Sequence, residues 1–455
     1  MNRKMETTSA LVPKTIDASP RKSFFISLLT RDIELSSCVL DLIDNSIDGI
    51  IQKSWVDISN MTSESAENNE PLSNYNINVE LTENHFVIKD NGSGISEEIL
   101  TDYAFRFWAW EWDNHSDTYN WLSVFWIWMK RAFFKIGKKI LLNTKTQSEC
   151  ITVELDVDEW EKDEKRTINY EKTTNSTSET GTEITITQLN EDIIHQIRDK
   201  DYMKDRIVKL LTMSYPLFIS AWLQITINSI LIEDKLPKII KEDKYYTVRE
   251  EKNFNGSDVD LKIVAGFIKS GNPEKTDTED TGWFVFCNSR NVLYADKDYT
   301  TWWGMRSMRK FHSSINPFIG YVFFTSKKEK NLPRNTTKDG IVFDNIIYQK
   351  ALDRMIELGR PIVQFLSKKY QKNSGFNEIS QGKKEEAIVT IIQEQNNGQV
   401  FDQIDNSSTE IVQYYVEKEK LENIKNFLQS VERTTISNRV VWERTFDYFY
   451  KNEIE

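Results

Sequence analysis

Residues 41–49 read DLIDNSIDG and combine two patterns that constrain how this part of the chain can fold. Four apolar residues recur at three- and four-residue steps, the spacing of a buried stripe on an α-helix: Leu40, Ile43, Ile47 and Ile50. Four polar residues fall on the opposite face: Asp41, Asp44, Asn45 and Asp48. Residues 21–56 are therefore predicted to be helical, with one face buried and the other lined by carboxylates and one carboxamide.

The polar face holds side chains that suit metal-assisted hydrolysis. Asn45 offers a hard carbonyl oxygen of the kind that Mg²⁺ accepts, and Asp41 is one helical turn away, where it would orient or deprotonate an attacking water. The same pattern is equally typical of a solvated helix surface.

Two short glycine-bearing segments add possible ligand contacts. The strand-like run FVIK ends in DNGSGIS, residues 90–96, where Asp90 would accept a hydrogen bond from an exocyclic amine and Gly92 and Gly94 permit close backbone approach. GTEITI, residues 181–186, enters another predicted strand and places the Thr182 hydroxyl for use beside Asp90. Taken alone, each segment reads as an ordinary turn.

The stretch from residue 108 to 128 contains no glycine but six tryptophans: Trp108, Trp110, Trp112, Trp121, Trp126 and Trp128. From Asn120 it reads NWLSVFWIWMKRAFFKIGKK. With glycine at the last three of these tryptophans it becomes NGLSVFGIGMKRAFFKIGKK, which has the form of a glycine-rich loop that covers phosphates. Glycine is scarce in the whole chain, at 16 of 455 residues, against a usual share of about 7%.

In this order and spacing, the pieces resemble the nucleotide site of the GHKL ATPases, which include DNA gyrase B, MutL, ATP-dependent heat-shock chaperones, histidine kinases and MORC proteins. The resemblance covers roughly residues 25–345. It implies a Bergerat-type domain that binds ATP with Mg²⁺. Asp41 would be the general base, although most members carry glutamate there and aspartate is one methylene shorter. Asn45 would bind the Mg²⁺ ion.

The resemblance also assigns the remaining contacts. Asp90 would recognise the adenine amine, helped by Gly92, Gly94 and Thr182. Lys130, directly after the lid, would meet the phosphates. Three tryptophans would stand at lid positions that contact the nucleotide: Trp121, Trp126 and Trp128.

The second half of the chain carries two further similarities. NSRNV, residues 288–292, resembles a segment of MutL-like transducer domains. LPRNTTKDGI, residues 332–341, resembles the loop that sends a lysine to the γ-phosphate, which would be Lys338, although a solvated loop lysine explains the pattern equally well. Such a contact would couple ATP binding to domain movement.

Several consecutive strands favour an α+β fold over alternating βαβ units. Strands are expected at 139–145, 150–156, 166–171 and 182–187, and helices at 97–107, 129–134, 190–215 and 346–370. We expect an N-terminal arm (1–24), a GHKL ATP-binding domain (25–200), a transducer-like α+β domain (201–345) and a mostly helical C-terminal region (346–455).

Tryptophan in a phosphate-covering lid needs an explanation, because left-handed backbone costs a non-glycine residue about 1–2 kcal/mol and indole bulk adds overpacking. Three hypotheses are open. The protein is a relative that does not hydrolyse ATP, or the tryptophans form an aromatic contact surface. Alternatively, they are glycines misread from UGA codons, which would also affect Trp55, Trp222 and Trp302. UGG codons at the lid positions would exclude the last hypothesis.

Composition excludes several other classes of protein. The net charge of −12 argues against a generally basic nucleic-acid binder, and no run approaches 18 apolar residues, so neither a membrane partner nor a spanning helix is expected. Three separated cysteines fit a reducing, cytoplasmic location. No histidine precedes Asn45 as a phosphoacceptor, which argues against a histidine kinase.

These observations predict an ATPase that uses Mg²⁺·ATP to drive a conformational switch. The resemblance implies a homodimer that forms on ATP binding and an unidentified protein or DNA client. The alternative is a nucleotide-binding scaffold with a disabled lid and no turnover.

Overall fold

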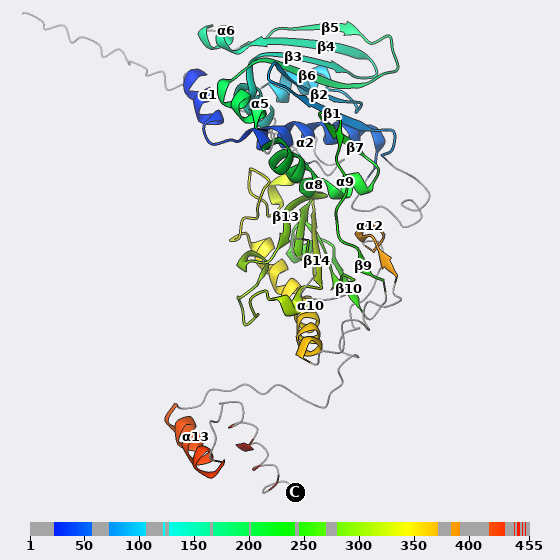
Figure 1. Cartoon of the computed structure of the whole chain (residues 1–455). Coiled ribbons are helices and arrows are strands. Elements are labelled where there is room, and N and C mark those ends of the chain that lie inside the picture. Colours follow the sequence, from blue (N-terminus) through cyan, green and yellow to red (C-terminus); the bar gives the residue numbers. More distant parts are fainter. Residues whose placement is uncertain are drawn as a thin grey trace, which may run out of the picture. The chain divides into compact units, whose positions relative to one another are not determined.

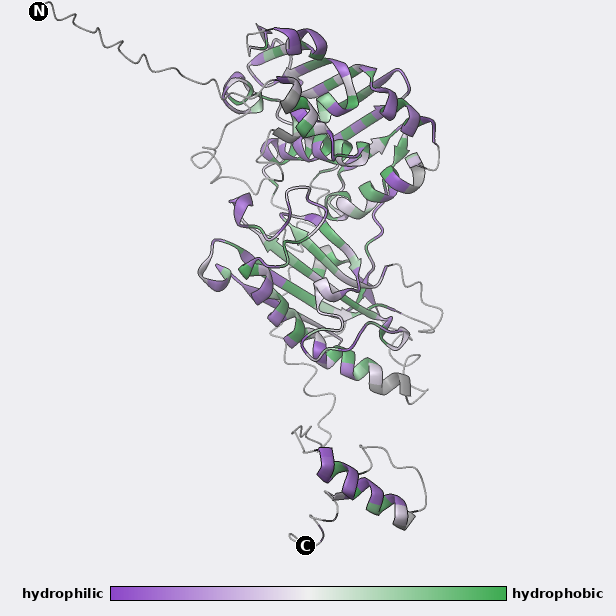
Figure 2. Cartoon of the chain, turned by 90° about the vertical axis from the view of Figure 1, so that its left-hand side faces the viewer, coloured by the Kyte–Doolittle hydropathy of each residue, from purple (hydrophilic) through white to green (hydrophobic). Residues whose placement is uncertain are grey.

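The structure is a computed structural model of the whole chain. It describes residues 22–56, 72–105, 122, 127–163, 167–199, 202–241, 245–269, 280–371, 384–391 and 418–432, with five single positions from 441 to 451. The chain forms two compact units, Met1–Ile404 and Asp405–Glu455. In the second unit, helix α13 (Lys418–Glu432) carries mostly hydrophilic residues (Figure 2).

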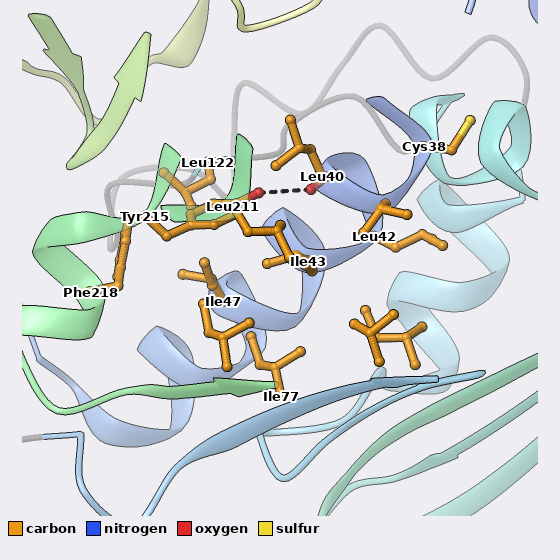
Figure 3. Packing of buried hydrophobic residues seen from close by; sticks show 14 of the residues in the cluster. Cys38, Leu40, Leu42, Ile43, Ile47, Ile77, Leu122, Leu211, Tyr215 and Phe218 are labelled. Atoms are coloured by element: carbon orange, nitrogen blue, oxygen red, sulfur yellow. Dashed lines mark hydrogen bonds between the residues drawn. The ribbon is translucent and has the colours of Figure 1, made fainter. Parts of the chain in front are cut away.

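The segment predicted as one helix over 21–56 forms two helices, α1 (Lys22–Thr30) and α2 (Leu35–Ser54). The break falls at residues 31–34, where Glu34 has extended backbone angles and starts α2. The apolar stripe of α2 is buried as predicted, and Figure 3 shows Ile43 and Ile47 above Ile77 of the underlying sheet. The polar face is also buried, because Asp41, Asp44 and Asp48 are at most 5% exposed. A solvated helix surface is therefore the wrong interpretation of this pattern.

An eight-stranded sheet forms the body of the first half, in the order β5-β4-β3-β6-β2-β1-β7-β8. Its strands alternate between buried and more exposed residues, as expected for a sheet with one packed face, and α2 and α5 lie on the same side of it (Figure 1). All pairs are antiparallel except β1 with β7. The strands are β1 (Asn76–Leu81), β2 (His85–Asp90), β3 (Gly137–Lys145), β4 (Glu149–Asp156), β5 (Tyr170–Thr174), β6 (Gly181–Leu189), β7 (Gln224–Ile227) and β8 (Ile230–Leu231).

Most predicted elements of this half are present, with two corrections. The strand expected at 166–171 is β5 at Tyr170–Thr174. Every residue of this strand is exposed, so the sequence has no apolar alternation that would mark where the strand begins and ends. The single helix expected over 190–215 is interrupted at Asp199, which has extended backbone angles. After Ile227 the chain turns back in a hairpin, because Asn228 and Ser229 have positive φ. The helices after α2 are α4 (Glu97–Ile99), η2 (Leu100–Ala104), α5 (Ile127–Ile136), α6 (Val157–Lys162), α7 (Glu191–Arg198), η3 (Tyr202–Val208), α8 (Lys209–Ser214) and α9 (Pro216–Ser220).

A second sheet of five strands has the order β10-β11-β14-β12-β13 and its own apolar core. Figure 2 shows that its strands are dominated by hydrophobic residues, and α10 (Ile346–Gln371) packs against them. The fold is α+β, as predicted. The remaining elements are β9 (Ile239–Ile240), β10 (Tyr246–Glu251), η4 (Phe254–Gly256), β11 (Asp260–Phe267), β12 (Gly282–Cys287), β13 (Arg290–Asp296), η5 (Tyr299–Thr301), η6 (Ser313–Ile315), β14 (Phe318–Thr325), η7 (Glu329–Asn331), β15 (Glu385–Glu386) and α12 (Ile388–Ile391).

Three tryptophans have left-handed backbone: Trp55 (φ 59°), Trp222 (φ 73°) and Trp302 (φ 88°). These are the three positions outside the lid at which the sequence suggested glycine. Trp55 and Trp222 are exposed, whereas Trp302 is fully buried in the core of the second sheet.

Candidate functional site

A pocket opens between α2, the end of β2, β6 and the start of α5. Its empty volume, which includes open solvent, is about 600 Å³. Its floor is apolar, and most of its polar groups come from the motifs that the sequence singled out. The lining residues in those motifs are Asn45, Ser46, Asp48, Gly49, Asp90, Gly94 and Thr182.

Asp90 ends β2 and is held by backbone donors. Its Oδ1 accepts hydrogen bonds from the backbone N–H of Gly92 (2.9 Å) and of Thr182 (3.2 Å), so the second and third motifs meet at this carboxylate. Burial raises the pKa of Asp90 to about 6, against the opposing effect of these donors and of Ser46. The carboxylate is fixed in position but carries its negative charge only above about this pH.

The glycines beside Asp90 are required by close backbone packing. A Cβ on Gly92 would lie 2.7 Å from the Gly49 carbonyl carbon of α2. Gly94 has a φ of +73°, and a Cβ there would lie 2.0 Å from the Lys145 carbonyl oxygen. Any larger residue would push this turn away from α2 or from β3.

On α2, Asn45 and Asp48 face the pocket. The side-chain amide nitrogen of Asn45 is buried and has no hydrogen-bond partner within the described part of the chain. Asp48 accepts a hydrogen bond from the backbone N–H of Leu122 at 2.7 Å, and the Leu122 carbonyl accepts one from Arg334 at 2.6 Å. Leu122 is the one described residue between positions 106 and 126.

Asp41 is buried beside the pocket rather than among the lining residues, and it pairs with Arg131 of α5 at 2.8 Å. Burial raises the pKa of Asp41, while Lys338 and Arg131 act in the opposite direction. A carboxylate with a raised pKa accepts a proton more readily. Arg131 was not singled out from the sequence, because the basic run in which it lies gave no sign of which cation turns inward.

Lys130 turns away from the pocket lining. Its Nζ donates to the Ala104 carbonyl at 3.0 Å, and burial lowers its pKa to about 7. It was predicted to meet the phosphates, and the structure brings it together with η2 instead of with Asp90 or Asn45. Trp128 lies on the first turn of α5, whereas Trp121 and Trp126 fall outside the described residues.

Lys338 reaches α2 from the loop after η7. Its Nζ donates to Asp44 Oδ2 at 2.7 Å, and Arg290 at the start of β13 forms an ion pair with the same oxygen. The Tyr215 hydroxyl donates to Asp44 Oδ1 at 2.8 Å and to the Leu40 carbonyl at 3.0 Å, the bond drawn in Figure 3. Lys338 is only 2% exposed, so a solvated loop lysine is the wrong interpretation.

Residues 33–193 match a protein-family model described as histidine kinase-, DNA gyrase B-, and HSP90-like ATPase. The matched range contains α2, the Asp90 turn, α5 and β6, which are the elements that build the pocket. No curated protein sequence matches the chain. Within the described residues, no helix is long and apolar enough to cross a membrane, and no group of three acidic, histidine or cysteine side chains is placed to hold a metal ion.

Proposed function

Because residues 33–193 belong to the GHKL superfamily of ATPases, we propose that this protein binds Mg²⁺·ATP in the pocket beside α2 and hydrolyses it. The observation that carries the proposal is the environment of Asp90. Its carboxylate borders the pocket and is oriented by two backbone N–H groups, one from each flanking motif. Such a fixed acceptor above an apolar floor suits the exocyclic amine of adenine.

The residues present fit a Mg²⁺ ion that is bound largely through phosphate oxygens. Mg²⁺ is commonly held in proteins by one or two side chains together with substrate phosphates and water. Asn45 borders the pocket, and its amide nitrogen makes no competing hydrogen bond within the described part of the chain. Its carbonyl oxygen would therefore be the protein ligand, and the ion would offset phosphate charge.

Asp41 would act on the attacking water, with Arg131 as the group that orients it. The 2.8 Å ion pair fixes one carboxylate oxygen and leaves the other to accept a proton. Lys130 and Lys338 would meet the phosphates, which requires both to leave their present partners. The lid would cover the phosphates through positions 121, 126 and 128.

The proposed domains are the nucleotide domain over 25–200, a transducer-like domain over 201–345 and a C-terminal region over 346–455. Strands β7 and β8 pair with the first sheet, so the nucleotide domain would also include residues 224–231. ATP binding would drive formation of a homodimer, and the switch would act on a protein or DNA client.

A nucleotide-binding scaffold without turnover is the second candidate. Two observations favour it: tryptophan stands at the lid positions, and the candidate base is already ion-paired. The two candidates differ in turnover and agree in nucleotide binding.

The test is an assay of phosphate release by the purified chain and by Asp41→Ala, with Asp32→Ala, an exposed aspartate outside the pocket, as control. We expect Asp41→Ala to lose about 10²- to 10⁴-fold in rate, the usual contribution of a general base, and to keep its affinity for ADP. Equal rates for the wild type and Asp41→Ala would refute hydrolysis with Asp41 as the general base, while ADP binding without turnover would establish the scaffold.

A further inference from the structure

Thr144 and Thr182 lie directly opposite each other on the paired strands β3 and β6. Their hydroxyl oxygens are 3.1 Å apart, within hydrogen-bond distance. Thr182 borders the pocket, whereas Thr144 is not among the lining residues and is only 1% exposed. Thr144 Oγ also accepts a hydrogen bond from the Ile95 backbone N–H at 2.7 Å. A buried hydroxyl therefore connects the glycine turn after Asp90 to a threonine of the pocket wall.

The burial of Thr144 decides which of the two hydroxyls donates. A hydroxyl has one hydrogen to donate and two lone pairs that accept. If Thr182 donated, the Thr144 oxygen would accept from both Thr182 and Ile95, and its own hydrogen would have no acceptor in the described part of the chain. Leaving a buried donor unsatisfied is costly. In the opposite arrangement Thr144 donates to Thr182, the buried hydroxyl is fully paired, and the Thr182 hydrogen is available to an acceptor in the pocket.

The Thr182 hydroxyl is placed beside the Asp90 carboxylate. The Thr182 backbone N–H donates to Asp90 Oδ1 at 3.2 Å, and both residues line the pocket. The wall therefore offers an acceptor and a donor as neighbours. One edge of adenine carries the complementary pair, an amine donor on C6 and an acceptor at N1. Hypoxanthine and guanine carry the reverse pair, a C6 carbonyl and an N1–H, and such differences in polarity are what proteins use to distinguish bases.

We propose that Thr144 is a positioning residue that holds the Thr182 hydroxyl as a donor toward the pocket, and that the pocket thereby prefers adenine to hypoxanthine and guanine nucleotides. The proposal rests on the proposed function and adds to it a residue outside the pocket lining. Thr182 could accept an N1–H only by leaving its own hydrogen unpaired. Without the Thr144 hydroxyl, the Thr182 side chain would lose the bond that fixes its rotamer, and Asp90 alone would select the base.

The test compares the affinities of ADP and IDP for the purified full chain, measured by calorimetry at a pH above the Asp90 pKa of about 6. The two nucleotides differ only at C6 and N1 of the base. Thr144→Val removes the hydroxyl and keeps the shape, so the preference for ADP over IDP should fall about three- to tenfold, the contribution of one neutral hydrogen bond. Thr144→Ser keeps the hydroxyl and should keep the wild-type preference.

Three further variants locate the effect. Thr152→Val is the matched control, because the Thr152 hydroxyl also bonds to a neighbouring strand, at Asn143 Oδ1 (2.9 Å), but lies outside the pocket lining. Its preference should equal that of the wild type. Thr182→Val should lower the preference as Thr144→Val does, and it leaves the bond between Ile95 and Thr144 in place. In the double variant, Thr144→Val should add nothing, because the hydroxyl that it positions is gone.

The outcomes separate the two proposals. If neither nucleotide binds the wild-type chain, the proposed function fails. If ADP binds but Thr144→Val weakens ADP and IDP equally, Thr144 only anchors the glycine turn through Ile95, and its role in base selection is refuted. A further fall in the Thr182→Val background would also overturn the proposal, because it would act through a different group. Circular dichroism melting verifies that each variant is folded. Should Thr144→Val not fold, an unchanged preference in Thr182→Val refutes the proposal.

Discussion

At the scale of single residues, two of the tryptophans with left-handed backbone are expected to have opposite effects on stability when they are replaced by glycine. Trp55 caps the end of α2, donating its N–H to the Ile51 carbonyl, and its side chain is largely exposed. Glycine is the preferred residue at such a position, since it adopts positive φ without a Cβ clash. Trp55→Gly should therefore raise the free energy of unfolding by about 1 kcal/mol, measured by urea denaturation.

Trp302 has the same backbone geometry but should respond in the opposite direction. Its ring is fully buried and meets the rings of Trp283 and Trp303 at 5.1 and 5.4 Å. Emptying such a site costs about 3–5 kcal/mol, which outweighs the relief of backbone strain. The hypothesis that these tryptophans are misread glycines gains support from the backbone at Trp55 and Trp222, whereas packing at Trp302 opposes it. A stabilising Trp302→Gly would reverse that judgement.

At the scale of elements, Asp90 at the end of β2 and the glycine turn that follows it predict that the affinity for ADP depends on pH. Burial raises the pKa of Asp90 to about 6, so the carboxylate that we propose as the acceptor for adenine is ionised above this pH and protonated below it. ADP affinity should fall as the pH drops through 6, by about tenfold for the loss of one charged hydrogen bond. Asp90→Asn, assayed across the same pH range, separates this titration from that of the nucleotide itself.

The raised pKa of Asp90 affects the stability of the fold in the opposite direction to its effect on ADP affinity. A folded pKa above the ordinary value of 3.8 for aspartate means that protonated Asp90 stabilises the fold. This contribution is complete below about pH 4 and is lost as the pH rises through 6. Acid should thus weaken nucleotide binding while the Asp90 contribution to stability grows. A parallel loss of both in wild type, but not in Asp90→Asn, would contradict the assignment.

Elements with periodic apolar residues could be predicted from the sequence, and those without them could not. The α2 stripe and the alternation in β2 each fixed an element, because burial of one face imposes a single period. The strand β5 was predicted at the wrong residues, because all of its residues are exposed and its sequence therefore shows no apolar period. In the site, motif order predicted Thr182 beside Asp90, but the contact is made by its backbone N–H, while its hydroxyl lies 3.1 Å from that of Thr144. The inward turn of Arg131 depends on packing between α2 and α5, which no local pattern records.

At the scale of the whole Met1–Ile404 unit, one buried carboxylate connects the two sheets. Asp44 belongs to the helix that covers the first sheet, and Arg290 starts an edge strand of the second. Sequence similarity pointed to the segments around Arg290 and Lys338, but not to their shared partner. The partner was hidden because an aspartate on a helix face gives no indication of which distant cation it will meet.

This connection predicts that damage to the second sheet spreads to the first. Arg290→Met keeps the side-chain volume and leaves Asp44 with Lys338 as its remaining cation, which should lower the free energy of unfolding by about 1.5–3 kcal/mol, the usual contribution of a hydrogen bond to a charged group. The loss should extend to α2, because its Asp44 carboxylate then favours local opening toward water. Hydrogen exchange followed by mass spectrometry would show reduced protection in Leu35–Ser54 as well as in β13.

Arg249→Met provides the matched control, since Arg249 is in the same sheet and pairs with Glu251 and Glu357 at a half-exposed site. Solvent screens such pairs, so this variant should cost less than about 1 kcal/mol and leave exchange in α2 unchanged. If Arg290→Met altered only the second sheet, Asp44 would be a local partner of β13. Reduced protection in α2 from Arg290→Met alone would establish that α2 and the second sheet are energetically one unit, which is the condition for the proposed nucleotide binding beside α2 to affect the second sheet.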